Sequence, residues 1–331
     1  MKMDIEYLGL NLKNPLISSA SPISSHTDQC KELEDNGIAA IVMHSLFEEE
    51  INHELHEVDH MLFHGKDSFA EALDFFPDND FENYESDNYL KQLETLKSSL
   101  DIPVIASLNG ISSGGWVKYA KLLEDSGADA LELNLYYPVN NANEDPLAIE
   151  KHYLDTISQV KAATQLNLAV KLSPYFTALP NFLRSAHING ASAAILFNRF
   201  YQPDIDLEEL QWQSKLYQSS SVDLAKALRA VAINYGQSDL ELSISGGVSC
   251  GTDIIKAVMA GARSVGVASV LYEKGLGHAS VMLKEAEAWM IEKEYDSFDQ
   301  MRGSISYTKS PNPAALERAN YVSLLRHSEG I

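Results

Sequence analysis

Two glycine-containing segments in the C-terminal third have the residue types of a phosphate-binding site. Gly246 and Gly247 follow the apolar segment Leu240–Ser245, and Gly266 lies inside the segment Ser264–Ala268. Adjacent glycines allow backbone N–H groups to approach an anion closely, and the turns after neighbouring strands can supply several such groups. The alternative is that Gly246-Gly247 serves only as a tight turn. The two segments together favour a phosphate.

Two polar side chains interrupt apolar segments near their ends. Lys171 lies in Leu168–Leu172, and Asn134 lies in Ala130–Leu135. An unpaired ammonium is costly to bury, so Lys171 is expected to face a bound group on which negative charge develops, or to pair with Glu132. Asn134 could bind a ligand, or it could be an ordinary strand-end amide. Both are candidate catalytic residues.

Four histidines recur at helical spacing in one polar stretch: His53, His56, His60 and His64. On a helix they would share one face, where imidazoles could ligate a metal. The neighbouring carboxylates also suit a substrate-facing or pH-responsive lid, or an ordinary polar surface. We predict no metal site in this stretch.

Eight apolar segments of strand length alternate with segments of helical spacing, which predicts a (β/α)8 barrel. The strand-like segments are Pro15–Ala20, Ala39–Ser45, Pro103–Leu108, Ala130–Leu135, Leu168–Leu172, Ala193–Asn198, Leu240–Ser245 and Ser264–Ala268. The helix-like segments are Gln29–Asn36, Tyr89–Leu100, Trp116–Ser126, Pro146–Ala163, Leu179–Asn189, Val222–Asn234, Gly251–Ala260 and His278–Ile291. A doubly wound open sheet with a small extra domain is the alternative.

The lengths of the connections suggest where a site would lie. Those at about 46–88 and 199–221 are longer than ordinary loops and follow the second and sixth strands, at the end of a barrel where sites are built. We expect them to act as lids on a barrel formed by residues 1–292. Residues 293–331 are expected to be a C-terminal extension that packs on the barrel or on a partner.

Composition excludes several classes of partner. The 331 residues carry 25 Lys+Arg and 47 Asp+Glu, a net charge of −22, which would repel nucleic acids and anionic lipid surfaces. No apolar run approaches the ~20 residues of a spanning helix. Cys30 and Cys250 lie far apart and match no zinc or disulfide pattern. These features predict a cytoplasmic protein that binds neither nucleic acid nor membrane.

Taken in order, several motifs resemble those of dihydroorotate dehydrogenases over about residues 4–292. The motifs are Asn14–Ser21, Leu131–Leu135 with Pro138, Lys171–Phe176, Ser245–Val248 and Val265–Ala268. The resemblance implies an FMN-binding barrel in which hydride passes between a small CH–CH or alkene substrate and the flavin. It also implies a role in pyrimidine biosynthesis and a homodimer.

The resemblance further assigns ligand contacts residue by residue. It implies that the FMN phosphate lies at Gly246, Gly247, Gly266 and Ala268. It implies flavin-ring contacts from Ala20, Ser21, His44, Ser45, Ser107, Asn134 and Lys171. Asn198 aligns with a substrate-binding asparagine of the family.

Three positions depart from the family pattern. The residue before Pro138 is Tyr137, where the family has the Cys or Ser that removes a substrate proton. A phenol has a reference pKa near 10, so Tyr137 is a poor base at neutral pH unless a cation such as Lys171 lowers its pKa. As an acid, it could protonate an activated alkene. His44 replaces a usual lysine, and Phe47–His56 replaces the family's substrate loop.

These departures predict that dihydroorotate itself reduces the flavin slowly. The chain has no clustered cysteines and no dinucleotide-binding glycine motif, so electrons must leave through a second small substrate or a partner protein. Two other functions remain open: a non-redox barrel enzyme that binds a phosphorylated substrate, and an inactive flavin-binding subunit.

Overall fold

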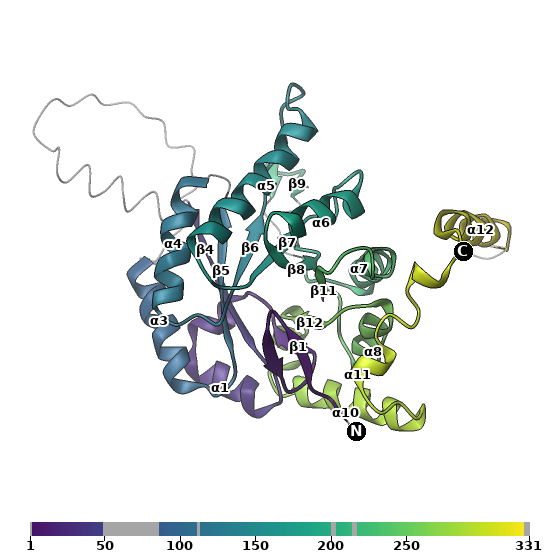
Figure 1. Ribbon diagram of the computed structural model, residues 1–331, viewed down its shortest axis with the longest axis horizontal. Helices are drawn as coiled ribbons and strands as arrows, with labels where there is room; N and C mark the ends of the chain where they lie inside the picture. Colours follow the sequence, from purple (N-terminus) through teal and green to yellow (C-terminus); the bar gives the residue numbers. More distant parts are fainter. Residues whose placement is uncertain (1, 49–85, 111–112, 200–202, 214–216, 328–331) are drawn as a thin grey trace, which may run out of the picture.

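The computed structural model describes residues 2–48, 86–110, 113–199, 203–213 and 217–327 (Figure 1). Its centre is a closed barrel of eight parallel strands. The strands are β3 (Leu16–Ser18), β4 (Ile41–Phe47), β5 (Val104–Gly110), β6 (Ala130–Leu135), β7 (Leu168–Leu172), β8 (Ala191–Leu196), β11 (Glu241–Ser245) and β12 (Ser264–Val267). Their order around the barrel is their order in the chain. The predicted (β/α)8 barrel is confirmed, and the open-sheet alternative is wrong.

Helices cover the outside of the barrel between successive strands (Figure 1). They are α1 (Thr27–Asp35), α3 (Ser86–Ser99), α4 (Ser113–Asp125), α5 (Pro146–Ala163), α6 (Leu179–Ile188), α7 (Ser221–Asn234), α8 (Gly251–Ala260) and α10 (His278–Glu292). Local signals set their starts: the Asp145 carboxylate accepts from the Leu147 N–H ahead of α5, and Ser220 and Asp223 form a capping box at α7.

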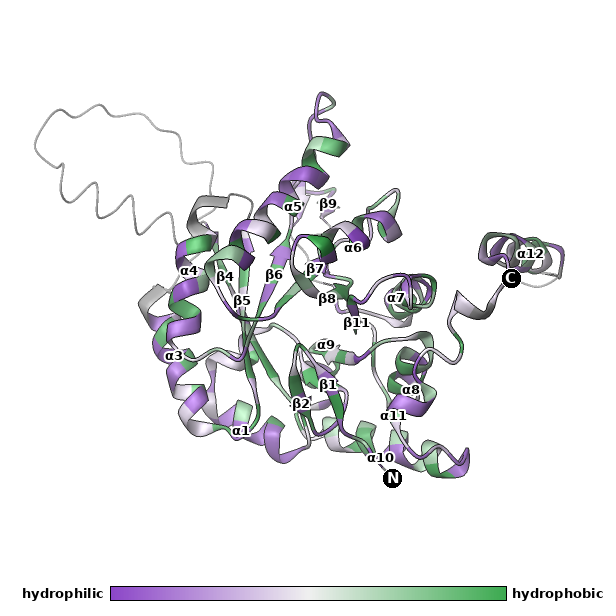
Figure 2. Ribbon diagram, viewed as in Figure 1, coloured by the Kyte–Doolittle hydropathy of each residue, from purple (hydrophilic) through white to green (hydrophobic). Residues whose placement is uncertain are grey.

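The barrel strands are buried on both faces, as their nearly continuous apolar sequences predicted. Every residue of β6 and β7 is buried. Figure 2 shows hydrophobic stretches concentrated on the strands, whereas the surrounding helices alternate hydrophobic and hydrophilic residues. Polar side chains inside the barrel wall are therefore exceptions that require partners.

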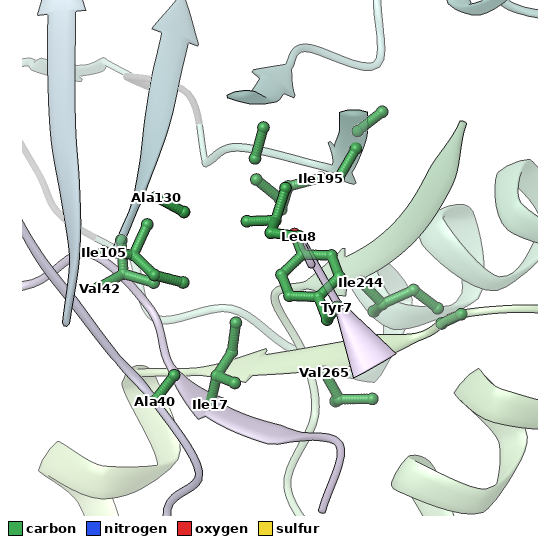
Figure 3. Close-up of a cluster of buried hydrophobic side chains, with 14 of the residues drawn as sticks. Tyr7, Leu8, Ile17, Ala40, Val42, Ile105, Ala130, Ile195, Ile244 and Val265 are labelled. Atoms are coloured by element: carbon green, nitrogen blue, oxygen red, sulfur yellow. The ribbon is translucent and has the colours of Figure 1, made fainter. Parts of the chain in front are cut away.

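An N-terminal hairpin that the sequence analysis did not predict closes one end of the barrel. Its strands β1 (Ile5–Tyr7) and β2 (Leu10–Leu12) pair antiparallel. Tyr7 and Leu8, only 1% and 2% exposed, pack into the barrel core (Figure 3). The Leu8 N–H donates to Glu241 at the start of β11, and Asn167, just before β7, donates to the Leu8 carbonyl. The hairpin thus closes the amino-terminal ends of the strands, which leaves the carboxyl-terminal ends for a site.

Two predicted long connections are only partly described. Residues 49–85, which contain His53, His56, His60 and His64, lie outside the described residues. In the second connection, β9 (Asp204–Asp206) and β10 (Gln211–Gln213) form a short hairpin. A six-residue helix, α9 (Ser269–Lys274), and a 3-10 turn, η1 (Pro22–Ser25), also follow barrel strands.

The C-terminal extension consists of α11 (Phe298–Met301), the 3-10 helix η2 (Tyr307–Lys309) and α12 (Pro313–His327). Phe298 and Met301 are buried in the same core as the barrel residues. In contrast, α12 lies apart from the barrel in Figure 1 and is joined to α7 by the ion pair between Arg229 and Glu317. Within the described ranges, no helix is long and apolar enough to cross a membrane.

Candidate functional site

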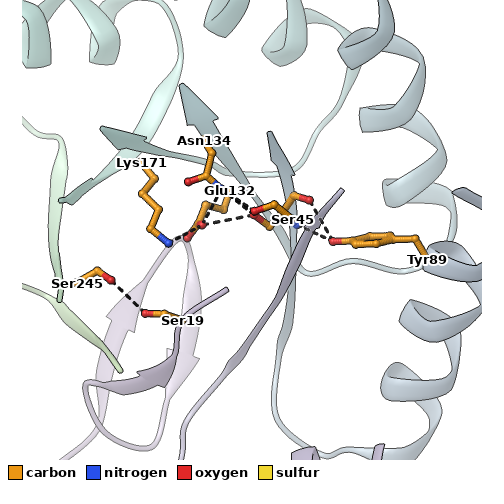
Figure 4. Close-up of polar contacts among 8 residues, drawn as sticks. Ser19, Ser45, Tyr89, Glu132, Asn134, Lys171 and Ser245 are labelled. Carbon is orange, nitrogen blue, oxygen red and sulfur yellow. Dashed lines mark hydrogen bonds and ion pairs between the residues drawn. The ribbon is translucent and has the colours of Figure 1, made fainter. Parts of the chain in front are cut away.

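Five polar side chains from four neighbouring strands meet inside the carboxyl-terminal half of the barrel. We call them the strand-end cluster: Ser45 of β4, Ser107 of β5, Glu132 and Asn134 of β6, and Lys171 of β7 (Figure 4). The parallel register explains this meeting, because Ser45 pairs with Ser107, Ser107 with Glu132, and Asn134 with Lys171. Sequence reasoning had proposed four of these five residues as ligand contacts, and the fold brings them together.

Hydrogen bonds connect the cluster across the strands. The Ser45 and Ser107 hydroxyls are 2.8 Å apart. The Asn134 side-chain NH2 group donates to Ser45 Oγ at 2.8 Å and to Ser107 Oγ at 3.2 Å. Tyr89 of α3 fixes the backbone of Ser107 from outside the barrel, since its hydroxyl donates to the Ser107 carbonyl and accepts from the Ser107 N–H.

Lys171 and Glu132 form a buried ion pair. Lys171 Nζ lies 3.2 Å from Glu132 Oε1, and the two side chains are 6% and 4% exposed. Ser107 and Asn134 also donate to Glu132 Oε1, each at 3.4 Å. The alternative in which Lys171 pairs with Glu132 is therefore what the structure shows. The ammonium has further donors beyond this single contact, so it remains able to bind a second acceptor.

Among the described residues, the buried polar atoms that have no hydrogen-bond partner include Asn134 Oδ1 and Ser21 Oγ, near this end of the barrel. Asn134 is 3% exposed and Ser21 is 8% exposed. An unsatisfied buried polar atom costs about 1–3 kcal/mol, so such atoms are typical of places where a ligand supplies the partner. Ala20, which precedes Ser21, packs partly buried against the core at the end of β3.

Backbone conformation and close packing explain the glycines after β11 and in β12. Gly246 and Gly247 have φ of +91° and +76°. A Cβ on Gly247 would lie 2.0 Å from the Ser220 carbonyl oxygen, and a Cβ on Gly266 would lie 2.3 Å from Ser19 Oγ. At Gly246 the nearest atom would be 3.8 Å away. The tight turn is thus present, the chain packs closely against Gly247 and Gly266, and a Cβ on Gly246 would make only an ordinary van der Waals contact with Ser219.

Two serines join the turns on either side of this glycine pair. Ser219 precedes α7, and Ser269 begins α9 directly after Ala268. Their hydroxyls are 3.1 Å apart, and the Ser219 N–H also donates to Ser269 Oγ at 3.4 Å. Hydroxyls and backbone N–H groups of this kind are suitable donors for a phosphate.

His44 contacts the 3-10 turn η1 and helix α3. Its Nδ1 lies 3.2 Å from Ser24 Oγ and 3.3 Å from Ser25 Oγ, both in η1. Its ring packs edge-on against Tyr89, with ring centroids 5.0 Å apart. Burial lowers the pKa of His44 to about 4, so the imidazole is neutral at pH 7. His44 therefore does not supply the fixed cation that a lysine would provide.

Tyr137 lies two residues beyond β6 and pairs with a residue that the sequence analysis did not single out. Its hydroxyl donates to Glu144 Oε1 at 2.9 Å. This hydrogen bond and the negative charge of Glu144 raise the pKa of Tyr137 above its ordinary value of 10.0. The suggestion that Lys171 lowers this pKa is thus corrected: Lys171 pairs with Glu132, and a carboxylate faces the phenol. No spacing signal in the sequence identifies Glu144, because the irregular path of the loop, and not a regular period, returns it to Tyr137.

Asn198 lies beside the end of β7, because its N–H donates to the Leu172 carbonyl at 2.8 Å. The side chain is partly buried. Within the described part of the chain, no group of three His, Cys, Asp or Glu side chains has the arrangement of a metal site.

Comparisons with known proteins extend across nearly the whole chain. A family model described as dihydroorotate dehydrogenase matches residues 2–290. The catalytic subunit of dihydroorotate dehydrogenase B (NAD(+)) from Thermoplasma volcanium is 25% identical over 306 residues, covering 89% of this chain and 95% of that protein. The NAD-dependent dihydropyrimidine dehydrogenase subunit PreA of Escherichia coli is 22% identical over 326 residues, covering 91% of this chain and 76% of that protein.

A solved structure shares the fold. It is the crystal structure of DHODH from Eimeria tenella in complex with ferulenol, which matches with a TM-score of 0.66 at 15% sequence identity. The match covers 92% of this chain and 88% of that chain.

Proposed function

Because this chain belongs to the dihydroorotate dehydrogenase family, we propose that it is an FMN-dependent oxidoreductase acting on a small CH–CH substrate. The observation that supports a flavin best is the buried, partnerless Asn134 Oδ1 beside the Lys171–Glu132 ion pair. A flavin ring presents both hydrogen-bond donors and acceptors along one edge, so it would satisfy this oxygen and the ammonium together.

The residues present fit FMN at both ends. Ala20, Ser21, Ser45, Ser107, Asn134 and Lys171 would hold the ring, and Gly246, Gly247, Gly266 and Ala268 would hold the phosphate. When bound, the flavin supplies two-electron chemistry by accepting or returning a hydride. Lys171 would stabilise the negative charge that reduction places on the ring, while Glu132 orients the ammonium. His44, which the family resemblance also assigns to the ring, would contact it as a neutral imidazole held by Ser24 and Ser25 of η1.

A charge placed at the proposed phosphate site tests the cofactor assignment. Ser269→Asp and Ser269→Asn differ by one charge and little in shape, so their comparison isolates electrostatics. Ser269→Asp is expected to weaken FMN binding at least tenfold relative to Ser269→Asn, because the carboxylate would repel the phosphate. Riboflavin, which has no phosphate, should bind both variants equally. Equal FMN affinities measured by flavin fluorescence would place the phosphate elsewhere.

Flavin bleaching tests the activity. Purified protein loaded with FMN should lose its visible flavin absorption when mixed without oxygen with a substrate that donates hydride. Dihydroorotate and 5,6-dihydrouracil are the first candidates, because the similar proteins named above act on dihydroorotate and dihydropyrimidines. We expect dihydroorotate to react slowly, with Asn198 as the substrate contact. A protein that binds no flavin but binds a phosphorylated sugar would favour the non-redox barrel enzyme instead.

We propose a cytoplasmic homodimer that takes part in pyrimidine metabolism. The family supports the dimer and the metabolic role, and the net charge of −22 supports a location away from anionic lipid surfaces. Sedimentation of the full chain at micromolar concentration would give the mass of a dimer, and the mass of a monomer would contradict the proposal.

A further inference from the structure

The loop after β6 holds a phenol and a carboxylate in contact. Tyr137 Oη donates to Glu144 Oε1 at 2.9 Å, while Glu144 Oε2 accepts from the Asn141 N–H at 3.3 Å. The Tyr137 N–H donates to Tyr153 Oη at 2.9 Å, which ties the start of the loop to α5. A backbone N–H thus holds the Glu144 side chain, and Tyr153 holds the Tyr137 main chain, in addition to the contact between the phenol and the carboxylate.

We propose that Tyr137 and Glu144 form the proton relay of the active site, with the phenol facing the substrate and the carboxylate as the terminal base. This inference rests on the proposed function. In substrate oxidation, the carbon-bound proton moves to Tyr137 Oη while the phenol's own proton moves to Glu144 Oε1. The accompanying hydride goes to the flavin, so a C=C bond forms and no charge is lost. Reduction of an alkene would run the same transfers in reverse.

A phenol is a poor base at neutral pH, and the relay explains how Tyr137 could nevertheless take up a proton from the substrate. At its reference pKa near 10, less than about one phenol in a thousand is ionised at pH 7. The contact with Glu144 raises the pKa of Tyr137 further, so a free phenolate is even rarer. The same contact lets the phenol pass on a proton without ionising first.

The phenol of Tyr137 donates its hydrogen bond to Glu144, and three aromatic side chains surround the pair. From the loop itself, Glu144 and Tyr136 are nearby; from α5, Tyr153 and His152 face it. Tyr153 accepts from the Tyr137 backbone rather than from its side chain. The His152 ring packs edge-on against the Tyr137 ring, with ring centroids 6.5 Å apart.

Substituting Glu144 separates the relay from a simple phenolate base. In Glu144→Gln the amide oxygen can still accept from the phenol, but a neutral amide takes up no proton at neutral pH. Glu150→Gln, on the first turns of α5, removes the same charge and serves as the matched control. The rate of flavin bleaching by dihydroorotate and by 5,6-dihydrouracil is measured from pH 7 to 10 in FMN-loaded full chain.

The rate of flavin bleaching in the wild type is expected to be nearly independent of pH over this range. Glu144→Gln should be slowed at least tenfold at pH 7 and should recover as pH rises and the phenol ionises, whereas Glu150→Gln should behave as the wild type. Bleaching of Glu144→Gln that matches the wild type at every pH would overturn the relay and leave the proposed function standing. A wild type that binds no flavin and is bleached by neither compound would refute the proposed function, and the relay with it.

An optical titration tests the pair without turnover. The ultraviolet absorbance change of tyrosinate formation, taken as the difference between each protein and its Tyr137→Phe counterpart, reports the ionisation of Tyr137 alone. In Glu144→Gln the pKa of Tyr137 should fall back toward 10, because the charge that raised it is gone. An unchanged pKa would show that the two groups do not interact in solution and would also overturn the relay.

Discussion

Replacing Lys171 with methionine leaves the Glu132 carboxylate buried without its cation. The two charged atoms are 3.2 Å apart and their side chains are 6% and 4% exposed, so water cannot compensate for the loss. Removing one partner of a buried pair typically costs 3–5 kcal/mol, because the remaining charge is unpaired in a medium that solvates it poorly. We therefore expect Lys171→Met to lower the free energy of unfolding by about 4 kcal/mol.

The double variant provides the control for this reasoning. Glu132→Gln alone leaves the ammonium facing an amide, and it should also be clearly destabilising. In Lys171→Met/Glu132→Gln neither charge remains, so the loss should be smaller than the sum of the two single losses by roughly 2–3 kcal/mol. Ser107 and Asn134 would still find an acceptor in the glutamine oxygen.

Urea denaturation of the flavin-free protein measures these differences, since bound flavin would stabilise each variant by a different amount. The same variants loaded with flavin provide an independent reading. Lys171→Met should lower the flavin reduction potential, and about 59 mV corresponds to a tenfold change in a one-electron equilibrium. If the losses in unfolding free energy of the two single variants simply added in the double variant, the buried ion pair would be refuted. An unchanged reduction potential in Lys171→Met would show that Lys171 does not interact with the flavin.

Two further predictions concern stability. Burial lowers the pKa of His44 from 6.5 to about 4, so between these pH values the unfolded chain binds a proton that the folded chain does not. The free energy of unfolding should therefore fall by up to about 3 kcal/mol as pH drops from 6.5 toward 4. Urea denaturation of His44→Gln should show a smaller decrease over the same pH range. A chain ending at residue 310 should keep the free energy of unfolding of the full chain. A chain ending at residue 292 should lose at least about 3 kcal/mol of that free energy, because Phe298 and Met301 no longer contribute to the core.

The order of strands and helices could be predicted because burial on both faces leaves a strong sequence pattern. Each of the eight predicted strand segments overlaps a barrel strand, and Gly37, Gly127, Gly190 and Gly261 have the positive φ expected where a helix ends. The β1–β2 hairpin was missed because strands of three residues are too short to show a period. Its role depends on Tyr7 entering a barrel that only the whole chain creates.

The candidate site could be predicted only where strands carry it. Asn134 and Lys171 stand out because a polar residue in a buried strand needs a partner, and the parallel register brings them side by side. The partner of Tyr137 could not be found this way, because the loop path that returns Glu144 follows no period. Likewise, nothing in the residue types shows that His44 contacts η1 and α3.

This difference between strands and loops indicates where the chemistry of the site is free to change. Ser45, Ser107 and Asn134 bond one another across three strands, so replacing one leaves a buried group unsatisfied at a cost of about 1–3 kcal/mol. The Tyr137 side chain contacts Glu144 in its own loop and His152 of α5, and it is only partly buried. A change of proton-handling residue there costs the barrel little. We therefore expect the flavin end of the site to follow the family closely and the proton-transfer end, built from Tyr137 and Glu144, to decide which substrate is turned over.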